Sequence, residues 1–296
     1  MRGRFGPGSS AESWLLLLPF IAGVLLLVVG PAMLTVGMSL FDTDLVTDRV
    51  YRGFDNFTEL GRDPIFLAAM RNSLIYIAGA VPLRVVAALG LALLLHCSFR
   101  GAGAYRTTAY LPTVVPDLAF ALAWLWILNP LYGPLNLTLA AIGIDGPAWL
   151  SDPWAARFGL IMMSAFTVGE GFLIAMATRR EIPDELYALA AMEGAGPWAT
   201  LRRVTLPLMA PTLVLLVLRD TIYSFQTSLV PALIITDGGP PRYATTFLGL
   251  FVYRSGFQYL RFGYAAAATV VMLALTGVLI AMQYAILRRW RHARVA

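Results

Sequence analysis

The chain has 296 residues, of which 58% are apolar and 13% are charged, and its mean hydropathy is +0.71. This balance excludes an ordinary water-soluble domain. The formal net charge of +5 rests on arginine alone, because the chain contains no lysine. The arginines flank apolar segments instead of forming a stripe along one polar surface, so no nucleic-acid partner is expected.

Six apolar segments are long enough to cross the hydrocarbon core of a membrane as helices. About 20 helical residues span its roughly 30 Å, and a helix satisfies its own backbone groups there. The predicted fold is therefore an all-α integral membrane protein with six transmembrane helices. The spans are expected at 14–40, 66–96, 107–129, 157–178, 205–235 and 261–287.

The arginines also predict the orientation of these spans, because positive residues accumulate in cytoplasmic loops. Residues 1–13 and 288–296 are expected to be cytoplasmic tails of one transmembrane domain at 14–287. The opposite loops carry most of the acidic residues. The arginines that fall on the predicted cytoplasmic side are Arg2, Arg4, Arg100, Arg106, Arg179, Arg180, Arg202, Arg203, Arg288, Arg289, Arg291 and Arg294.

The residue types that catalysis needs are sparse, so no enzyme is predicted. A Walker A loop requires a lysine to reach nucleotide phosphates, and the chain has none. His96 and His292 lie far apart, and Cys97 is the single cysteine. Neither a catalytic site, a metal site nor a cofactor of this chain itself is therefore expected.

Prolines and ionisable residues mark irregular places within the spans. Pro112 and Pro116 in the third span, and two prolines that open the fifth, remove amide donors and favour kinks. Each ionisable residue costs roughly 2.5–3.5 kcal/mol at the centre of a span, so it is expected to face protein or water. These residues are Arg84, Asp117, Glu170, Arg219 and Asp220.

A polar segment at about 179–204 lies between the fourth and fifth spans. Pro183 and the acidic residues after it are typical of the first turn of a helix. Leu186, Leu189 and Glu193 recur at helical spacing, and Gly194 permits a left-handed turn. A short amphipathic helix that ends at Gly194 is predicted.

This segment resembles the cytoplasmic EAA loop of ABC-importer permeases. The carbohydrate-importer version reads Glu-Leu-Tyr-Glu-Ala-Ala-x-x-Asp-Gly-Ala-x-x-Trp, and here Glu185-Leu-Tyr187, Glu193-Gly-Ala195 and Trp198 take the corresponding positions. Ala188 stands where the family has its acidic residue. This replacement removes one possible salt bridge to the ATPase, and Glu185 or Glu193 could take its place. The resemblance assigns coupling to a partner ATPase to Glu185, Leu186, Tyr187, Ala188, Leu189, Ala190, Glu193, Gly194, Ala195 and Pro207.

Shorter matches from Asn56-Phe57 to Phe262-Gly-Tyr-Ala-Ala266 extend the resemblance over nearly the whole chain. They are similar to carbohydrate permeases of the maltose and glycerol-phosphate type, which have the type I ABC importer, or MetI-like, fold. The resemblance implies a lipid-embedded subunit of a bacterial or archaeal plasma membrane that forms half of a pore for a sugar or polyol. The implied partners are a second homologous permease, two ATPase subunits that bind ATP and Mg, and an extracytoplasmic solute-binding protein.

Two predicted spans contribute side chains to the expected substrate path. Glu170 lies between two glycines, at a level where similar sugar permeases contact substrate, and a carboxylate accepts hydrogen bonds from hydroxyls. Pairing of Glu170 with an arginine for structure alone is equally open. The candidate path residues are Glu170, Phe172, Thr221, Ser224, Phe225 and Ser228, of which the last four share one helical face.

Two alternatives to a carbohydrate importer remain. The chain could serve an importer of the same machinery for a non-sugar solute. It could also be a proton-coupled secondary transporter with Glu170 or Asp220 as the proton site.

Overall fold

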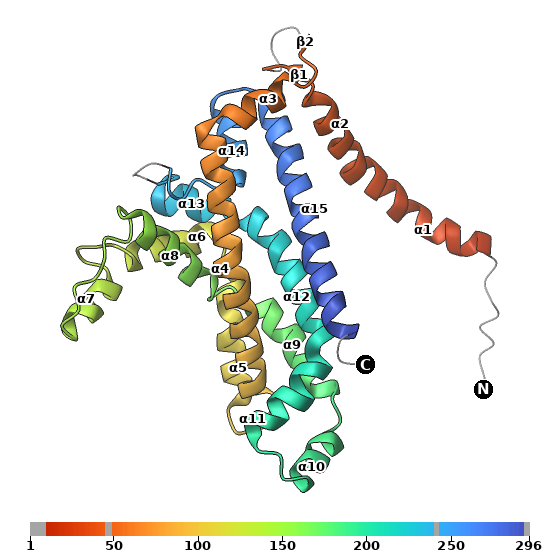
Figure 1. Ribbon diagram of the computed structural model, residues 1–296, viewed down its shortest axis with the longest axis vertical. Coiled ribbons are helices and arrows are strands. Elements are labelled where there is room, and N and C mark those ends of the chain that lie inside the picture. Colours follow the sequence, from red (N-terminus) through yellow and green to blue (C-terminus); the bar gives the residue numbers. More distant parts are fainter. Residues whose placement is uncertain (1–9, 45–48, 240–242, 293–296) are drawn as a thin grey trace. The chain divides into compact units, whose positions relative to one another are not determined.

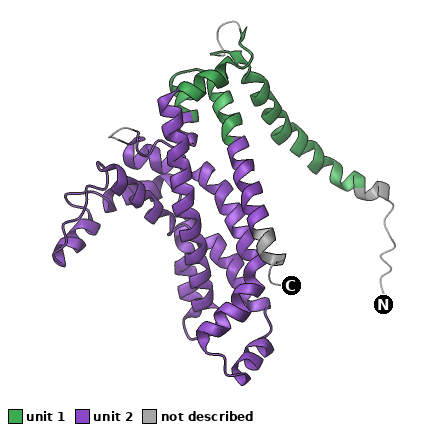
Figure 2. Cartoon of the chain, viewed as in Figure 1, with its two compact units in different colours: residues 1–62, 252–272 green, residues 63–251, 273–296 purple. Residues whose placement is uncertain are grey.

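The computed structural model describes residues 10–44, 49–239 and 243–292, and Figure 1 shows their arrangement along the chain. Residues 1–9 and 293–296 of the two predicted tails lie outside the described residues. The chain divides into two compact units (Figure 2). One comprises residues 1–62 and 252–272, and the other comprises residues 63–251 and 273–296.

The described residues contain four long apolar helical segments and two bent helix pairs, which make six spans if each bent pair is one span. The long segments are Trp14–Met38, Pro64–Leu95, Pro197–Thr227 and Phe262–Ile286. The bent pairs are Ala102–Val114 with Asp117–Ile127, and Pro153–Ser164 with Gly169–Glu181. All six predicted spans therefore have a helical counterpart, with two of them interrupted.

The third predicted span is not one straight helix. Helix α5 (Ala102–Tyr110) and the 3-10 turn η2 (Leu111–Val114) are separated from α6 (Asp117–Ile127) by a bend of 99°. Val115 and Pro116 lie between them with extended backbones, at ψ 131° and 138°. Proline lacks an amide donor and disfavours a helical conformation in the residue before it, so the break falls there.

The fourth and fifth predicted spans also differ from single helices in detail. Helices α8 (Pro153–Ser164) and α9 (Gly169–Glu181) meet at a bend of 46°. The fifth span begins earlier than predicted, because α11 (Pro197–Thr200) and the π-helical turn η3 (Leu201–Thr205) continue directly into α12 (Leu206–Thr227).

The first unit contains the first span and a small hairpin. The span consists of α1 (Ser10–Val24), the π-helical turn η1 (Leu25–Val29) and α2 (Gly30–Met38). The antiparallel strands β1 and β2 follow. Asn56 of α3 donates hydrogen bonds to the carbonyl oxygens of Ser39 and Phe41, at 2.9 and 3.0 Å, and thereby ties α3 to the end of α2 and to β1. The remaining elements here are β1 (Phe41–Asp42), β2 (Val50–Tyr51), α3 (Asp55–Arg62) and η4 (Arg254–Gln258).

The second unit holds the helices around the candidate site. Helices α14 and α15 each continue from one unit into the other. The elements not yet given are α4 (Pro64–Leu95), α7 (Pro134–Ala141), α10 (Asp184–Met192), α13 (Leu229–Thr236), α14 (Leu248–Tyr253) and α15 (Phe262–His292).

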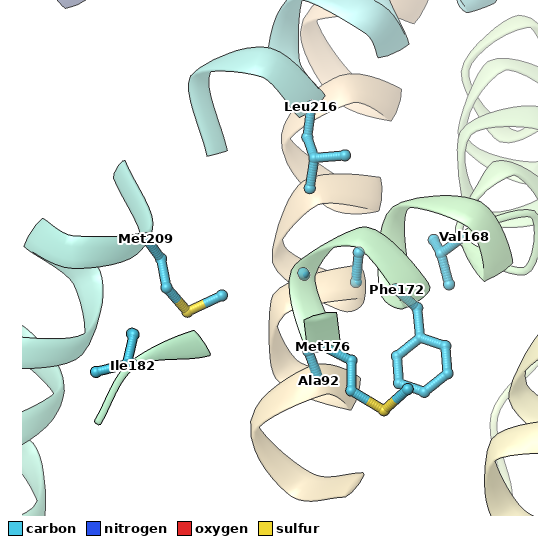
Figure 3. Close-up of a cluster of buried hydrophobic side chains, with 9 residues drawn as sticks. Ala92, Val168, Phe172, Met176, Ile182, Met209 and Leu216 are labelled. Atoms are coloured by element: carbon cyan, nitrogen blue, oxygen red, sulfur yellow. The ribbon is translucent and has the colours of Figure 1, made fainter. Parts of the chain in front are cut away.

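Helices α4, α9 and α12 form the core of the second unit (Figure 3). Ala88 and Ala92 keep the surface of α4 flat, and Phe172 of α9 packs there with no exposed surface. Met209 and Leu216 add α12 to the same cluster. Small residues let helix backbones approach closely, so this core holds the two ends of the polar segment at 179–204 in fixed positions.

Candidate functional site

Helix α10 forms as the sequence predicts. Pro183 occupies the N-cap position directly before its first turn, and Asp184 and Glu185 lie in that turn. At its end Gly194 has a φ of 76°, the Gly194 amide donates to the Ala191 carbonyl, and the Ala195 amide donates to the Ala190 carbonyl at 2.9 Å. These two bonds define a Schellman motif, which requires a left-handed residue at Gly194. The turn therefore fixes the direction in which the chain leaves α10.

Tyr187 ties α10 to the ends of two long helices. Its ring centre lies 4.0 Å from the guanidinium carbon of Arg179 in the last turn of α9. Its hydroxyl lies 3.1 Å from the hydroxyl of Thr205, at the start of α12. Arg179 and Thr205 are both buried, at 7% and 3% exposure. A displacement of α10 would therefore act directly on both helices.

The opposite side of α10 and the turn after it presents apolar side chains to the surface. Leu189 is 55% exposed, Met192 is 84% exposed and Trp198 is 71% exposed. Glu185, Ala188 and Glu193 are also exposed, so carboxylates flank the apolar residues. We call Leu186, Leu189, Met192 and Trp198 the apolar surface of the loop. Such a surface is typical of an interaction site between proteins.

The remaining predicted coupling residues lie around this surface. Ala190 faces inward and is 9% exposed, while Ala195 is half-buried beyond the turn. Pro207 is the second residue of α12, directly after the π-helical turn η3 that continues into this helix. The structure thus brings the predicted residues of α10 and its C-terminal turn onto one short segment, with Pro207 on the helix that follows.

Four charged residues form a continuous network across α4, α9 and α12. Arg219 contacts Glu170 and lies 3.0 Å from a carboxylate oxygen of Asp220. Arg84 pairs with Asp220, with 3.6 Å between Nε and Oδ2, and also donates to the backbone oxygen of Asp220 and to the hydroxyl of Ser224. Arg84 and Asp220 are 2% and 6% exposed. Buried charges require partners, and these two pair with each other.

A pocket opens beside this network, between α4, α6, α8, α12 and α13. Its cavity volume is about 30 Å³, and it opens into a wider space of about 400 Å³ that includes open solvent. Aromatic walls and scattered polar groups are typical of sites that bind small polar molecules. The lining residues are Tyr76 and Arg84 of α4, Asp117 and Phe120 of α6, Leu160, Met163 and Ser164 of α8 with Thr167 after it, and Tyr223, Thr227 and Pro231 of α12 and α13.

None of the six predicted path residues lines this pocket. Phe172 is enclosed in the apolar core, and Phe225 is 5% exposed. Ser224 binds Arg84, whereas the Thr221 hydroxyl bonds to Gln283. Glu170 is half-exposed and paired with Arg219, and Ser228 is 4% exposed.

The pocket instead uses the neighbouring face of α12 and α13. Tyr223, Thr227 and Pro231 recur every four residues, a helical spacing that was available in the sequence. No local spacing indicates Tyr76 as a lining residue of the pocket, because it belongs to α4, which is far from α12 and α13 in the sequence.

Comparisons with known proteins agree on one family. Residues 86–292 match the family model described as "Binding-protein-dependent transport system inner membrane component". The chain is 32% identical over 280 residues to the sulfoquinovosyl glycerol transport system permease protein SmoG of Agrobacterium fabrum, covering 93% of this chain and 89% of SmoG. It is 29% identical over 279 residues to the lactose transport system permease protein LacF of Rhizobium radiobacter, covering 92% and 93% of the two chains.

A solved structure shares the fold. The chain superposes on one from the bacterial alginate ABC transporter in complex with alginate pentasaccharide-bound periplasmic protein, with a TM-score of 0.80 and 25% identity. The match covers 94% of this chain and 96% of that one. The chain therefore belongs to the family of binding-protein-dependent transport system inner membrane components, with the fold of ABC importer permeases.

Proposed function

We propose that the chain forms half of the pore of an ATP-driven importer for a sugar or polyol. The family and the names of the similar permeases support this function. The observation that carries the substrate class is the pocket, because tyrosine rings cover the apolar faces of sugars while carboxylate and hydroxyl groups bind sugar hydroxyls. Of the candidate path residues, Glu170, Thr221, Ser224, Phe225 and Ser228 would extend the path, whereas Phe172 is enclosed in the core.

The apolar surface of the loop is the proposed docking site of a partner ATPase. Leu189 and Met192 would enter a groove of the partner, and Glu185 and Glu193 would supply the negative charge that Ala188 lacks. Closure of an ATPase dimer on ATP and Mg would move α10. Tyr187 would pass this movement to α9 and α12 through Arg179 and Thr205.

The assembly proposed for the chain has four kinds of component. A second homologous permease completes the pore, two ATPase subunits bind the cytoplasmic loops, and a solute-binding protein delivers substrate from the other side. Both termini and α10 would face the cytoplasm of a bacterial or archaeal cell. ATP binding opens the pore outward to receive the sugar, and the return inward releases it.

A purification with one designed variant tests this proposal. The chain is purified from its native membrane, its partners are identified, and ATP hydrolysis is measured with candidate sugars and binding protein. Leu189→Asp places a charge on the proposed docking surface and is expected to abolish ATPase recovery. Leu131→Asp changes another exposed leucine, between α6 and α7, and serves as the matched control.

Two outcomes contradict the proposal. Equal ATPase recovery with Leu189→Asp and with the unchanged chain would remove α10 as the docking site. A homogeneous, ATPase-free preparation that moves solute down a proton gradient would establish a secondary transporter instead. The pairing of both Glu170 and Asp220 with arginine argues against a free proton site.

A further inference from the structure

The two charged residues that line the pocket are in different electrostatic situations. Arg84 is 2% exposed, and Asp220 lies against its guanidinium group. Its positive charge is therefore already balanced by a carboxylate. Arg219 and Glu170 balance each other in the same network. The four charges, two positive and two negative, leave this network neutral.

Asp117 is not part of this network of paired charges. It lies in the first turn of α6 and lines the pocket together with Phe120. Within the described part of the chain, its carboxylate has neither a hydrogen-bond partner nor an ion-pair partner. The pocket therefore carries one uncompensated negative charge. Asp117 is exposed, and the rings of Tyr76, Phe120 and Tyr223 line the same pocket.

We propose that Asp117 selects the substrate by its charge. This inference rests on the proposed function and narrows the substrate class to uncharged sugars and amino sugars. The Asp117 carboxylate accepts hydrogen bonds from hydroxyl or ammonium groups, whereas it repels a carboxylate or sulfonate on the ligand. An anionic sugar is expected to bind about tenfold more weakly than its neutral counterpart, because like charges at this range repel even across partly screened space.

Matched sugars test this selectivity without interference from the binding protein. The purified complex of the chain with its second permease and ATPase subunits, without the solute-binding protein, is titrated with nine monosaccharides. These are the neutral, uronic-acid and amino forms of glucose, galactose and mannose. Equilibrium binding is measured at low and high salt. The neutral, uronic-acid and amino forms are then compared for whichever of the three parent sugars binds most tightly. Asp117→Asn is expected to bring the affinity for the uronic acid within about twofold of the affinity for the neutral sugar. In the unchanged protein, high salt is expected to reduce the difference between these two affinities.

Two further variants separate charge from folding. Asp117→Glu keeps the charge and is expected to retain the preference of the unchanged protein for the neutral sugar over the uronic acid. Asp145→Asn removes a carboxylate that is exposed in the loop after α7 and does not line the pocket, and it is expected to leave the preference intact.

The possible failures are distinguishable. Strongest binding of the uronic acid, or a preference that Asp117→Asn does not change, would overturn the role of Asp117 while leaving a carbohydrate importer in place. Absence of binding by all nine sugars would count against the carbohydrate function itself, and with it against this inference.

Discussion

The guanidinium carbon of Arg179 lies 4.0 Å from the ring centre of Tyr187, so the last turn of α9 stacks on the middle of α10. The same ring reaches Thr205 with its hydroxyl, at the point where η3 passes into α12. One side chain thus joins a short surface helix to two long membrane helices. The contact is mostly buried, so water replaces it poorly when it breaks.

Substitution of Tyr187 is expected to uncouple ATP hydrolysis from transport. Tyr187→Ala removes both the stacking on Arg179 and the hydrogen bond to Thr205, so hydrolysis should continue while uptake per ATP falls at least several-fold. Tyr187→Phe retains the stacking and should lose only about 0.5–1.5 kcal/mol of contact energy. The measurement is the ratio of sugar uptake to ATP hydrolysis in proteoliposomes.

Thr205→Val provides the control for the Tyr187 hydrogen bond. It removes the other partner of the same bond, so Tyr187→Phe and Thr205→Val should have effects that do not add when combined. Additive effects would show that the bond between the two hydroxyls is not the shared cause.

Removal of the Asp220 carboxylate is expected to destabilise the folded chain strongly. Asp220→Leu leaves the buried Arg84 without its carboxylate, which costs about 3–5 kcal/mol. The double variant Arg84→Met with Asp220→Leu removes both charges and should recover much of this stability. Thermal unfolding in detergent measures the difference. Glu170→Gln breaks only a half-exposed pair and should cost at most about 1 kcal/mol.

Equal unfolding temperatures for Asp220→Leu and the double variant would contradict this account. The loss would then come from packing around residue 220 and not from an unpaired arginine.

Glu170 allows a test of the substrate path that is separate from stability. If its carboxylate binds sugar hydroxyls, Glu170→Gln should raise the KM for uptake several-fold, since one charge-assisted acceptor is lost. Glu170→Ala should raise it further. Unchanged uptake kinetics with both variants, in a normally assembled complex, would leave Glu170 only the pairing with Arg219.

Replacement of Gly194 is expected to weaken the turn after α10. A Cβ atom there would have open space around it, so the cost comes from the backbone φ of 76° alone. Gly194→Ala should cost about 1–2 kcal/mol, and Gly194→Asn less, because asparagine tolerates left-handed backbone better. The expected result is reduced ATPase binding, measured by copurification.

Gly196 is the matched control for Gly194. It also has open space around its Cβ position, but its φ is −70°, which alanine adopts without strain. If Gly196→Ala reduces ATPase binding as much as Gly194→Ala, the left-handed turn is not the reason.

Local features of the sequence predicted the elements of this protein well. Each span must satisfy its own backbone hydrogen bonds in lipid, so apolar length alone identifies it. The start of α10 after Pro183 and the turn at Gly194 depend on residues only a few positions apart, and the structure confirms both. The prolines of the third span likewise indicated a kink, although not a bend of 99°.

Contacts between distant residues were decided by the tertiary structure alone. Arg84 and Asp220 were both expected to need partners, but their pairing depends on how α4 packs against α12. Phe172 was expected in the substrate path, yet the same packing encloses it in the core. The pocket gathers side chains from five helices, and no local pattern specifies which faces of these helices meet. Hydropathy therefore determined the spans of this protein, while the packing of those spans decided which polar side chains share a site.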